Sequence, residues 1–194
     1  MTRRLSIGAL GIFVVLSAIL IIAEVGRLGP FAENPAPSDS GPVSNTARDA
    51  AFAVQMSLPR SVYHVGEAIE VATTATYVGS APTVRAYSEW DSLVVFSLEQ
   101  LDGPRDMLDV VSDLMCREVD LGRDQPIDVP FLKNGGYSAT DPQAAFWKQY
   151  FADRELHLPA GQWRIVAMLD ADLNPGCQHY ASSLSTAVTF DVVP

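Results

Sequence analysis

Residues 170–180, with the sequence DADLNPGCQHY, bring two Asp, one Asn, one Cys and one His into eleven positions. Asp170, Asp172 and Asn174 alternate, as the first oxygen ligands of a calcium loop do, because each side chain must turn toward one hard cation. An EF-hand loop also needs glycine at its sixth position and glutamate at its twelfth, and neither residue stands there. The match to a calcium loop is therefore partial, and a calcium site at these three residues is one interpretation of the segment.

The competing interpretation is a tight connection between two strands, which the same Asp, Asn, Pro and Gly residues also build. A transition-metal site at Cys177 and His179 needs at least one further ligand nearby, and the sequence supplies none. Cys116 and Cys177 are the only two cysteines, and in an oxidising compartment we expect them to form a disulfide. The sequence thus favours a turn pinned by a disulfide, with calcium as the alternative and no other cofactor.

Patterns typical of enzymes are missing from the sequence. It contains no G-x-S-x-G, H-E-x-x-H, P-loop or G-x-G-x-x-G segment. The three histidines, His64, His157 and His179, have no recognisable catalytic spacing. We therefore expect a non-catalytic protein, and the enzymatic alternative is a hydrolase whose site is assembled from scattered residues.

The N-terminal region predicts attachment to a membrane. Residues 5–23 form a run of nineteen without a charge, which as a helix reaches about 28 Å and nearly crosses a bilayer core. A cleaved signal peptide is the alternative, but this run is longer than the usual apolar region of a signal, and no clear small-x-small cleavage site follows. Arg3 and Arg4 favour a cytoplasmic tip at residues 1–4, which places the rest of the chain outside.

Residues 24–50 are rich in Pro, Ser, Ala and Asn and show no apolar period, so we expect them to form a tether. The whole chain has a formal net charge of −10. Such a surface repels nucleic acid and anionic lipid, which excludes nucleic acid as a partner. The expected partners are membrane lipid, through the N-terminal helix, and another envelope or membrane protein.

Residues 51–194 read as the folded domain, because apolar and polar residues alternate in several short segments. In residues 52–58, Phe52, Val54, Met56 and Leu58 share one side. Similar segments, some apolar on both faces, occur at residues 67–78, 92–101, 126–132, 154–158, 162–171 and 184–193. Seven or eight short strands separated by Gly, Pro and Asp turns predict an antiparallel β-sandwich.

Two turns carry a resemblance to known modules. The segments YHVGEAIEV (residues 63–71) and LHLPAGQWRIVA (residues 156–167) resemble strand entries of extracytoplasmic immunoglobulin-like and fibronectin-III-like modules, and they are also similar to the intracellular proteinase inhibitor family. The resemblance covers residues 51–194 and implies an immunoglobulin-like sandwich. It departs at Trp163, where a tyrosine corner has Tyr, because indole has a donor but no hydroxyl.

One segment breaks the β pattern. In TDPQAAFWKQYFA, residues 140–152, Thr140 or Asp141 is a candidate cap and Pro142 suits a first helical turn. The segment predicts a short inserted helix whose aromatic residues share one face. One interpretation is a lid on the sandwich, with Phe146 and Tyr150 inside. The other is a docking face for a partner, with Trp147, Lys148 and Phe151 as the candidate contacts.

These patterns lead to one main functional hypothesis, a membrane-anchored extracytoplasmic interaction or accessory module that is not catalytic. The alternative is a module that binds calcium or carbohydrate. Exposed aromatic residues in a groove favour a carbohydrate ligand, whereas an aromatic patch on a flat face favours a protein.

Overall fold

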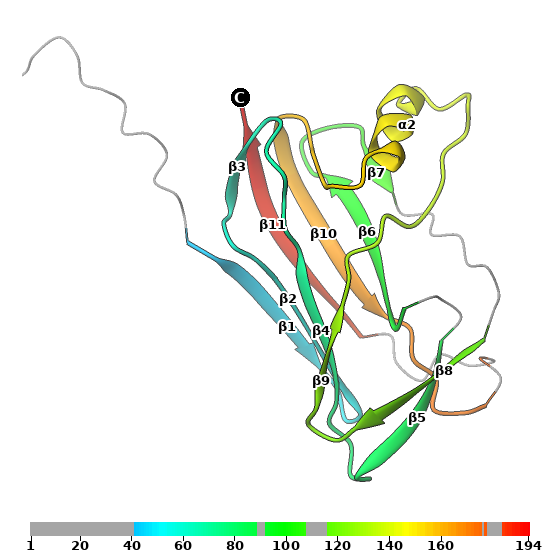
Figure 1. Cartoon of the computed structure of the whole chain (residues 1–194). Helices are drawn as coiled ribbons and strands as arrows, with labels where there is room; N and C mark the ends of the chain where they lie inside the picture. Colours follow the sequence, from blue (N-terminus) through cyan, green and yellow to red (C-terminus); the bar gives the residue numbers. More distant parts are fainter. Residues whose placement is uncertain (1–40, 89–91, 108–115, 176, 178–183) are drawn as a thin grey trace, which may run out of the picture. The chain divides into compact units, whose positions relative to one another are not determined.

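A computed structural model describes residues 41–88, 92–107, 116–175, 177 and 184–194 (Figure 1). Every described residue belongs to one compact unit, residues 39–194. This domain is mainly β and its sheets are antiparallel, consistent with the predicted β-sandwich. Its one described helix is α2 (Ala144–Ala152).

The strands form two larger sheets and one ribbon. The first sheet contains, in spatial order, β1 (Val43–Arg48), β2 (Phe52–Leu58), β4 (Ala72–Tyr77) and β9 (Pro126–Val129). The second contains β3 (Val62–His64), β11 (Ser185–Val193), β10 (Gly161–Leu169), β6 (Val94–Gln100) and β7 (Asp106–Met107). The ribbon pairs β5 (Thr83–Ser88) with β8 (Arg117–Gly122). All of these strand pairs are antiparallel except β3 with β11.

Alternation in the sequence explains the core. In β2, Phe52, Val54, Met56 and Leu58 are all buried, as predicted. Phe52 of β2 faces Tyr77 of β4 across the ladder, and their rings meet edge to face with centres 5.9 Å apart. The second sheet adds Trp163 and other buried side chains from β10 and β11, so that both sheets contribute to a single apolar cluster. Full burial of each large apolar side chain stabilises the domain by about 1.5–3 kcal/mol.

Two of the predicted segments have a different structure. Residues 154–158 form no strand, although Leu156 and Leu158 are buried as their alternation predicts. The backbone carbonyl of Leu156 accepts a hydrogen bond from Ile69 N, so the segment packs on the domain without joining a sheet. Residues 43–48, predicted to be tether, form strand β1 along β2. Most side chains of β1 are exposed, so its sequence has no apolar period that would identify it.

The prediction of seven or eight strands is too low, because the described residues form eleven. The additional strands are β1, β3, β5, β7 and β8, which are short, exposed or lie outside the two-sheet core. Across the described residues, no helix has the length and apolar character needed to cross a bilayer. The predicted membrane segment, residues 5–23, lies outside the described part of the chain.

The edges of the sheets carry residues that oppose further strand pairing. Strand β9 starts at Pro126 and is followed by Pro130, and proline has no backbone N–H to donate. Strand β7 is two residues long, and β8 presents Arg117, Glu118 and Asp120. At the other side of the domain, the Asn45 side chain of β1 donates a hydrogen bond to the carbonyl of Ala187 on β11, which joins the two sheets.

Candidate functional site

The aromatic face of α2 is mostly buried. Trp147 is 2% exposed and Tyr150 5%, whereas Phe146 and Phe151 are half-buried and Lys148 is exposed. The prediction that Trp147 lies at the edge and contacts a partner is therefore wrong. The helix is rotated so that positions 147 and 150, three residues apart, point into the core, and the aromatic arc alone did not fix this rotation. Tyr150, predicted to belong to the lid, is indeed buried.

The start of α2 also differs slightly from the prediction. Neither Thr140 nor Asp141 is the N-cap, since the helix begins at Ala144 after Gln143, whose side chain makes no capping bond. Asp141 instead accepts a hydrogen bond from Gln143 N at 2.6 Å, in a turn immediately upstream. The segment thus enters the helix through an Asx turn.

Lys133 fixes the other end of α2. Its ammonium donates to the backbone carbonyls of Tyr150, Asp153 and Glu155, at 2.7, 3.0 and 2.6 Å, and lies 4.5 Å from the centre of the Tyr150 ring. A cation suits this position because the last carbonyls of a helix have no partner within the helix. Burial lowers the pKa of Lys133, and nearby Asp153 opposes that shift. Burial raises the pKa of the Tyr150 phenol.

The helix packs on the start of β10 through Trp163, which is fully buried. The rings of Phe146 and Trp163 stack with centres 6.1 Å apart, and Trp147 meets Phe146 at 4.7 Å. The indole N–H of Trp163 donates to the carbonyl of Pro159, four residues upstream, at 3.0 Å. The buried indole N–H is therefore satisfied by a backbone carbonyl.

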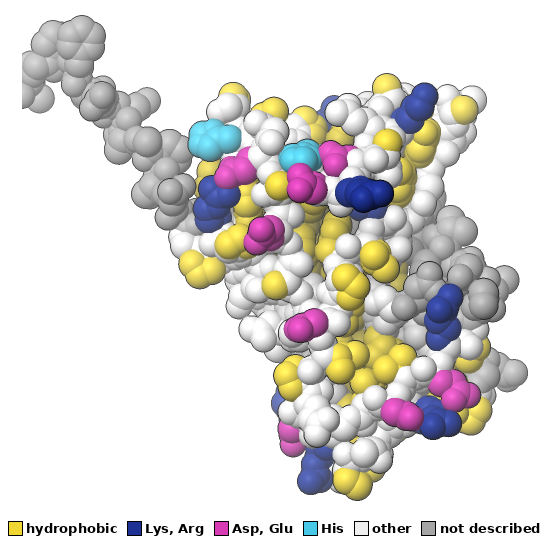
Figure 2. Space-filling view, viewed as in Figure 1, with side chains coloured by type: hydrophobic (Ala, Val, Ile, Leu, Met, Phe, Trp, Pro, Cys, Tyr) yellow, Lys and Arg dark blue, Asp and Glu magenta, His cyan; other side chains and the backbone are white. Residues whose placement is uncertain are grey.

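A groove of about 410 Å³ runs between α2 and the turn after β3. The two walls come from segments far apart in the sequence, and the lining includes Val65, Arg105, Phe146, Gln149, Asp153 and His157. Val65 is 53% exposed, which is unusual for an apolar side chain beside a cavity. Figure 2 shows acidic, basic and histidine side chains gathered on the same face as α2, and hydrophobic side chains between β9 and the β5–β8 ribbon.

Arg105 is held in this groove by two neutral groups. Its guanidinium donates to the Gln100 side-chain oxygen at 2.7 Å, and its central carbon lies 4.8 Å from the centre of the Phe146 ring. Gln100 is itself nearly buried, and its amide nitrogen donates to the carbonyl of Ala160 at 3.4 Å. The Nε atom of Arg105 is buried without a hydrogen-bond partner among the described residues.

An acidic and imidazole pair occupies another part of the lining. His157 Nδ1 lies 2.7 Å from Asp153 Oδ2, and His157 Nε2 lies 3.5 Å from Glu155 Oε2. The hydrogen bond from His157 and then that from the Glu155 backbone N–H lower the pKa of Asp153. His157 is half-buried and hydrogen-bonded to Asp153.

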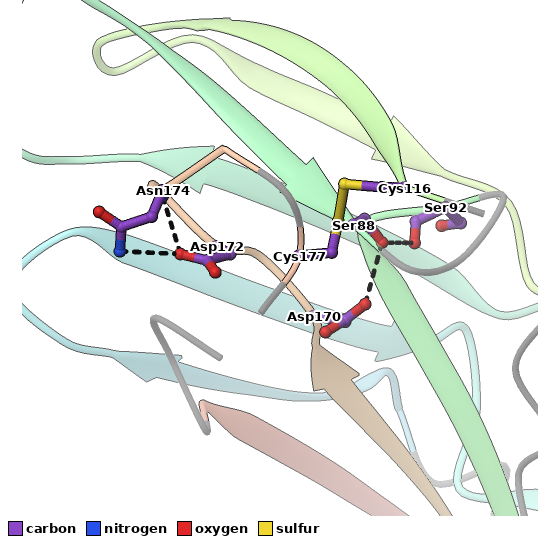
Figure 3. Close-up of a disulfide and its surroundings, with 7 residues drawn as sticks. All are labelled: Ser88, Ser92, Cys116, Asp170, Asp172, Asn174 and Cys177. Carbon is purple, nitrogen blue, oxygen red and sulfur yellow. Dashed lines mark hydrogen bonds between the residues drawn. A yellow bond between two sulfur atoms is a disulfide. The ribbon is translucent and has the colours of Figure 1, made fainter. Parts of the chain in front are cut away.

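The residues considered for calcium are engaged with the protein (Figure 3). Asp172 Oδ1 accepts hydrogen bonds from the backbone N and the side-chain amide of Asn174, at 2.8 and 3.1 Å. Asp170 Oδ2 accepts from Ser88 Oγ at 3.1 Å. The part of the chain that the structure describes contains no group of three His, Cys, Asp or Glu side chains placed to hold a metal ion. His179 lies outside the described residues.

The predicted disulfide is present. Cys116 and Cys177 are joined with their Cα atoms 5.7 Å apart (Figure 3). Asp172, on the same loop as Cys177, exchanges two backbone hydrogen bonds of 2.8 Å with Tyr87 of β5. The described part of this segment, residues 170–175 and Cys177, is thus held to the ribbon by a disulfide and a β-bridge.

Sequence reasoning missed the groove. Val65 and Arg105 stand in separate segments far from residues 145–159, and no spacing in the sequence indicates that these residues line one groove. Only Phe146 and Tyr150 had a detectable signal, the aromatic face of a predicted helix. Comparison with protein-family models, with curated proteins and with solved structures found no match to this chain.

Proposed function

We propose that this chain is a membrane-anchored extracytoplasmic interaction module that is not an enzyme. Three observations support the proposal: the charge-free run at residues 5–23, the Cys116–Cys177 disulfide and the groove beside α2. The disulfide is typical of an oxidising compartment. In this proposal residues 1–4 are cytoplasmic, residues 5–23 cross the membrane and the folded domain lies outside.

We further propose that the domain is immunoglobulin-like. In such folds the strands A, B and E share one sheet and C, F and G the other. Strands β2, β4 and β9 correspond to the first set, and β6, β10 and β11 to the second. The bond from Trp163 to Pro159 lies near the start of β10, where the fold has its tyrosine corner. The helix α2 is then an insertion between strands E and F.

The observation that carries the functional proposal is the composition of the groove. An exposed Val65 and a half-buried Phe146 offer apolar contact, and Arg105 offers a cation held in place by Gln100. A preformed apolar cavity with a few fixed polar groups is typical of a binding site. The Phe146 ring face is covered by Arg105, which leaves little open aromatic surface for stacking a sugar and favours a protein partner over carbohydrate.

Site-specific photo-crosslinking in native membranes tests this function. A photoreactive amino acid replaces Gln149, which is exposed and lines the groove, and in a matched control it replaces exposed Thr83 on the ribbon. We expect an adduct with one defined membrane or envelope protein from position 149 and not from position 83. Equal labelling at both positions, or none at 149, would refute the groove as the interaction site.

A further inference from the structure

Three arginines are half-buried in the described part of the chain, and one of them differs from the other two. Arg60 is paired with Glu67, and Arg164 is paired with Glu99. Arg105 has no carboxylate partner among the described residues and is held by an amide oxygen and an aromatic face. Because removing a charge from water is costly unless it is paired, an incompletely paired cation in a groove marks a place for an anion.

The geometry around Arg105 is preorganised. Gln100 accepts from one guanidinium nitrogen, its own amide is tied to Ala160, and the Phe146 ring lies against the guanidinium. The Gln100 oxygen accepts a hydrogen bond from the Arg105 guanidinium, but because the amide is neutral it does not neutralise the positive charge. The guanidinium has five N–H donors, and the bond to Gln100 is the only hydrogen bond that it makes to the described residues.

The class of anion follows from the charge balance. The chain carries a net charge of −10, and Asp153 also lines the groove, so a highly charged ligand is repelled. One planar guanidinium matches one planar carboxylate in charge and in hydrogen-bond geometry. Phosphate carries more charge and is usually bound by several cations, whereas Arg105 is the one Lys or Arg among the described residues that line this groove.

The remainder of the ligand is apolar, because Val65 and Phe146 flank the same groove and Val65 is exposed to an incoming group. We propose that the groove binds a partner protein through a short segment in which an apolar side chain stands next to an Asp or Glu. The carboxylate bonds to Arg105, and the apolar side chain covers Val65 and the exposed part of the half-buried Phe146. This inference rests on the proposed interaction function and specifies the chemistry of the partner.

The test uses the full chain in detergent micelles and a defined probe. The probe is a blocked tetrapeptide, Gly-Phe-Asp-Gly, in which p-benzoylphenylalanine replaces the Phe, and crosslinks are mapped by mass spectrometry. We expect labelling at α2 or at Val65 and Gly66. The unmodified Phe-Asp peptide should compete at least about tenfold better than the Phe-Asn peptide, because a hydrogen bond to a charged group is worth roughly a factor of ten or more.

Variants of Arg105 distinguish the effect of its charge on peptide labelling from the effect of its packing. Arg105→Gln should reduce labelling at least about tenfold, and Arg105→Lys should retain part of it. Arg154→Gln is the matched control, because Arg154 is exposed and does not line the groove, and it should label as the unchanged protein does. Melting curves of the variants identify any loss that comes from unfolding, and Arg105→Lys then provides the folded comparison.

The other outcomes overturn the inference in distinct ways. Equal competition by the Phe-Asp and Phe-Asn peptides, or no labelling of the groove, removes the carboxylate requirement. Competition by free 3-phenylpropanoate as strong as by the peptide assigns the groove to a small acid. A large rise in labelling after deletion of residues 24–40 assigns it to the chain's own N-terminal segment. The photo-crosslink from position 149 can also identify a native partner whose contacting segment has no acidic residue. That result refutes this inference, while the proposed function stands.

Discussion

The helix end and the ribbon end of the domain are stabilised in different ways. At the helix end, comprising α2 and residues 153–160, aromatic rings and Lys133 hold the helix without a covalent bond. At the ribbon end, comprising β5, β8, residues 170–175 and Cys177, a disulfide and a two-bond backbone bridge hold the loop. The groove lies at the helix end, where side chains meet from distant segments. The proposed binding groove is thus supported by side-chain packing, whereas the ribbon end is reinforced by a covalent bond.

Truncation at the helix end should have the largest effect. Trp147 is almost fully buried and touches Phe146 and Tyr150, so Trp147→Ala should destabilise the domain by about 3–5 kcal/mol. Lys148→Ala, its exposed neighbour, should change stability by less than about 0.5 kcal/mol. Chemical denaturation of both variants measures the difference, and a mild effect of Trp147→Ala would show that the helix is only loosely attached.

Removing the disulfide at the ribbon end should lower the free energy of unfolding by a similar or slightly smaller amount. The cysteines are 61 residues apart, and a loop of that length contributes about 4 kcal/mol in the chain-entropy model. The double variant Cys116→Ala, Cys177→Ala should lower stability by that order. Non-reducing peptide mapping should find the two cysteines in one linked peptide pair, and two free thiols in the native protein would remove this half of the comparison.

Removing the lysine at the end of α2 should have a smaller and local effect. Lys133→Met keeps much of the aliphatic stem but loses three hydrogen bonds to carbonyls, which should cost about 2 kcal/mol. Hydrogen exchange of α2 amides should accelerate while that of β5 and β8 stays unchanged. Uniform acceleration in both regions would contradict the separation of the two ends.

Lowering the pH should slightly destabilise both ends of the domain, through a different carboxylate at each end. The pKa of Asp153 is lowered by His157 at the helix end, and that of Asp120 by Arg85 at the ribbon end. A lowered carboxyl pKa gives stability that is complete above the unfolded value, near 4, and is lost as the pH falls through the folded value. Asp153→Asn and Asp120→Asn should each flatten this loss in melting curves between about pH 4 and pH 2. An unchanged acid response in both variants would exclude these pairs as its source.

The sequence predicted the elements whose alternation reflects burial. Phe52 to Leu58 follow a period of two because one face of β2 meets the core. It failed at Val43 to Arg48, where β1 is an exposed strand with no apolar period, and at residues 154–158, where buried leucines belong to an extended segment outside the sheets. The helix was predicted but its rotation was not, since Trp147 and Phe151 have similar apolar character. The groove depends on long-range packing of Arg105 against Phe146, for which local patterns give no information.

The prolines and charged residues along the sheet edges affect whether neighbouring copies of the domain can aggregate by strand pairing. A protein held on a surface meets its neighbours at high local concentration, and open strand edges would then template aggregation. Pro126 in β9, Pro130 just after it, and the charged side chains of β8 oppose the addition of a backbone strand. In the proposed membrane-anchored arrangement, contacts between copies along these two edges are therefore made by side chains and not by backbone pairing.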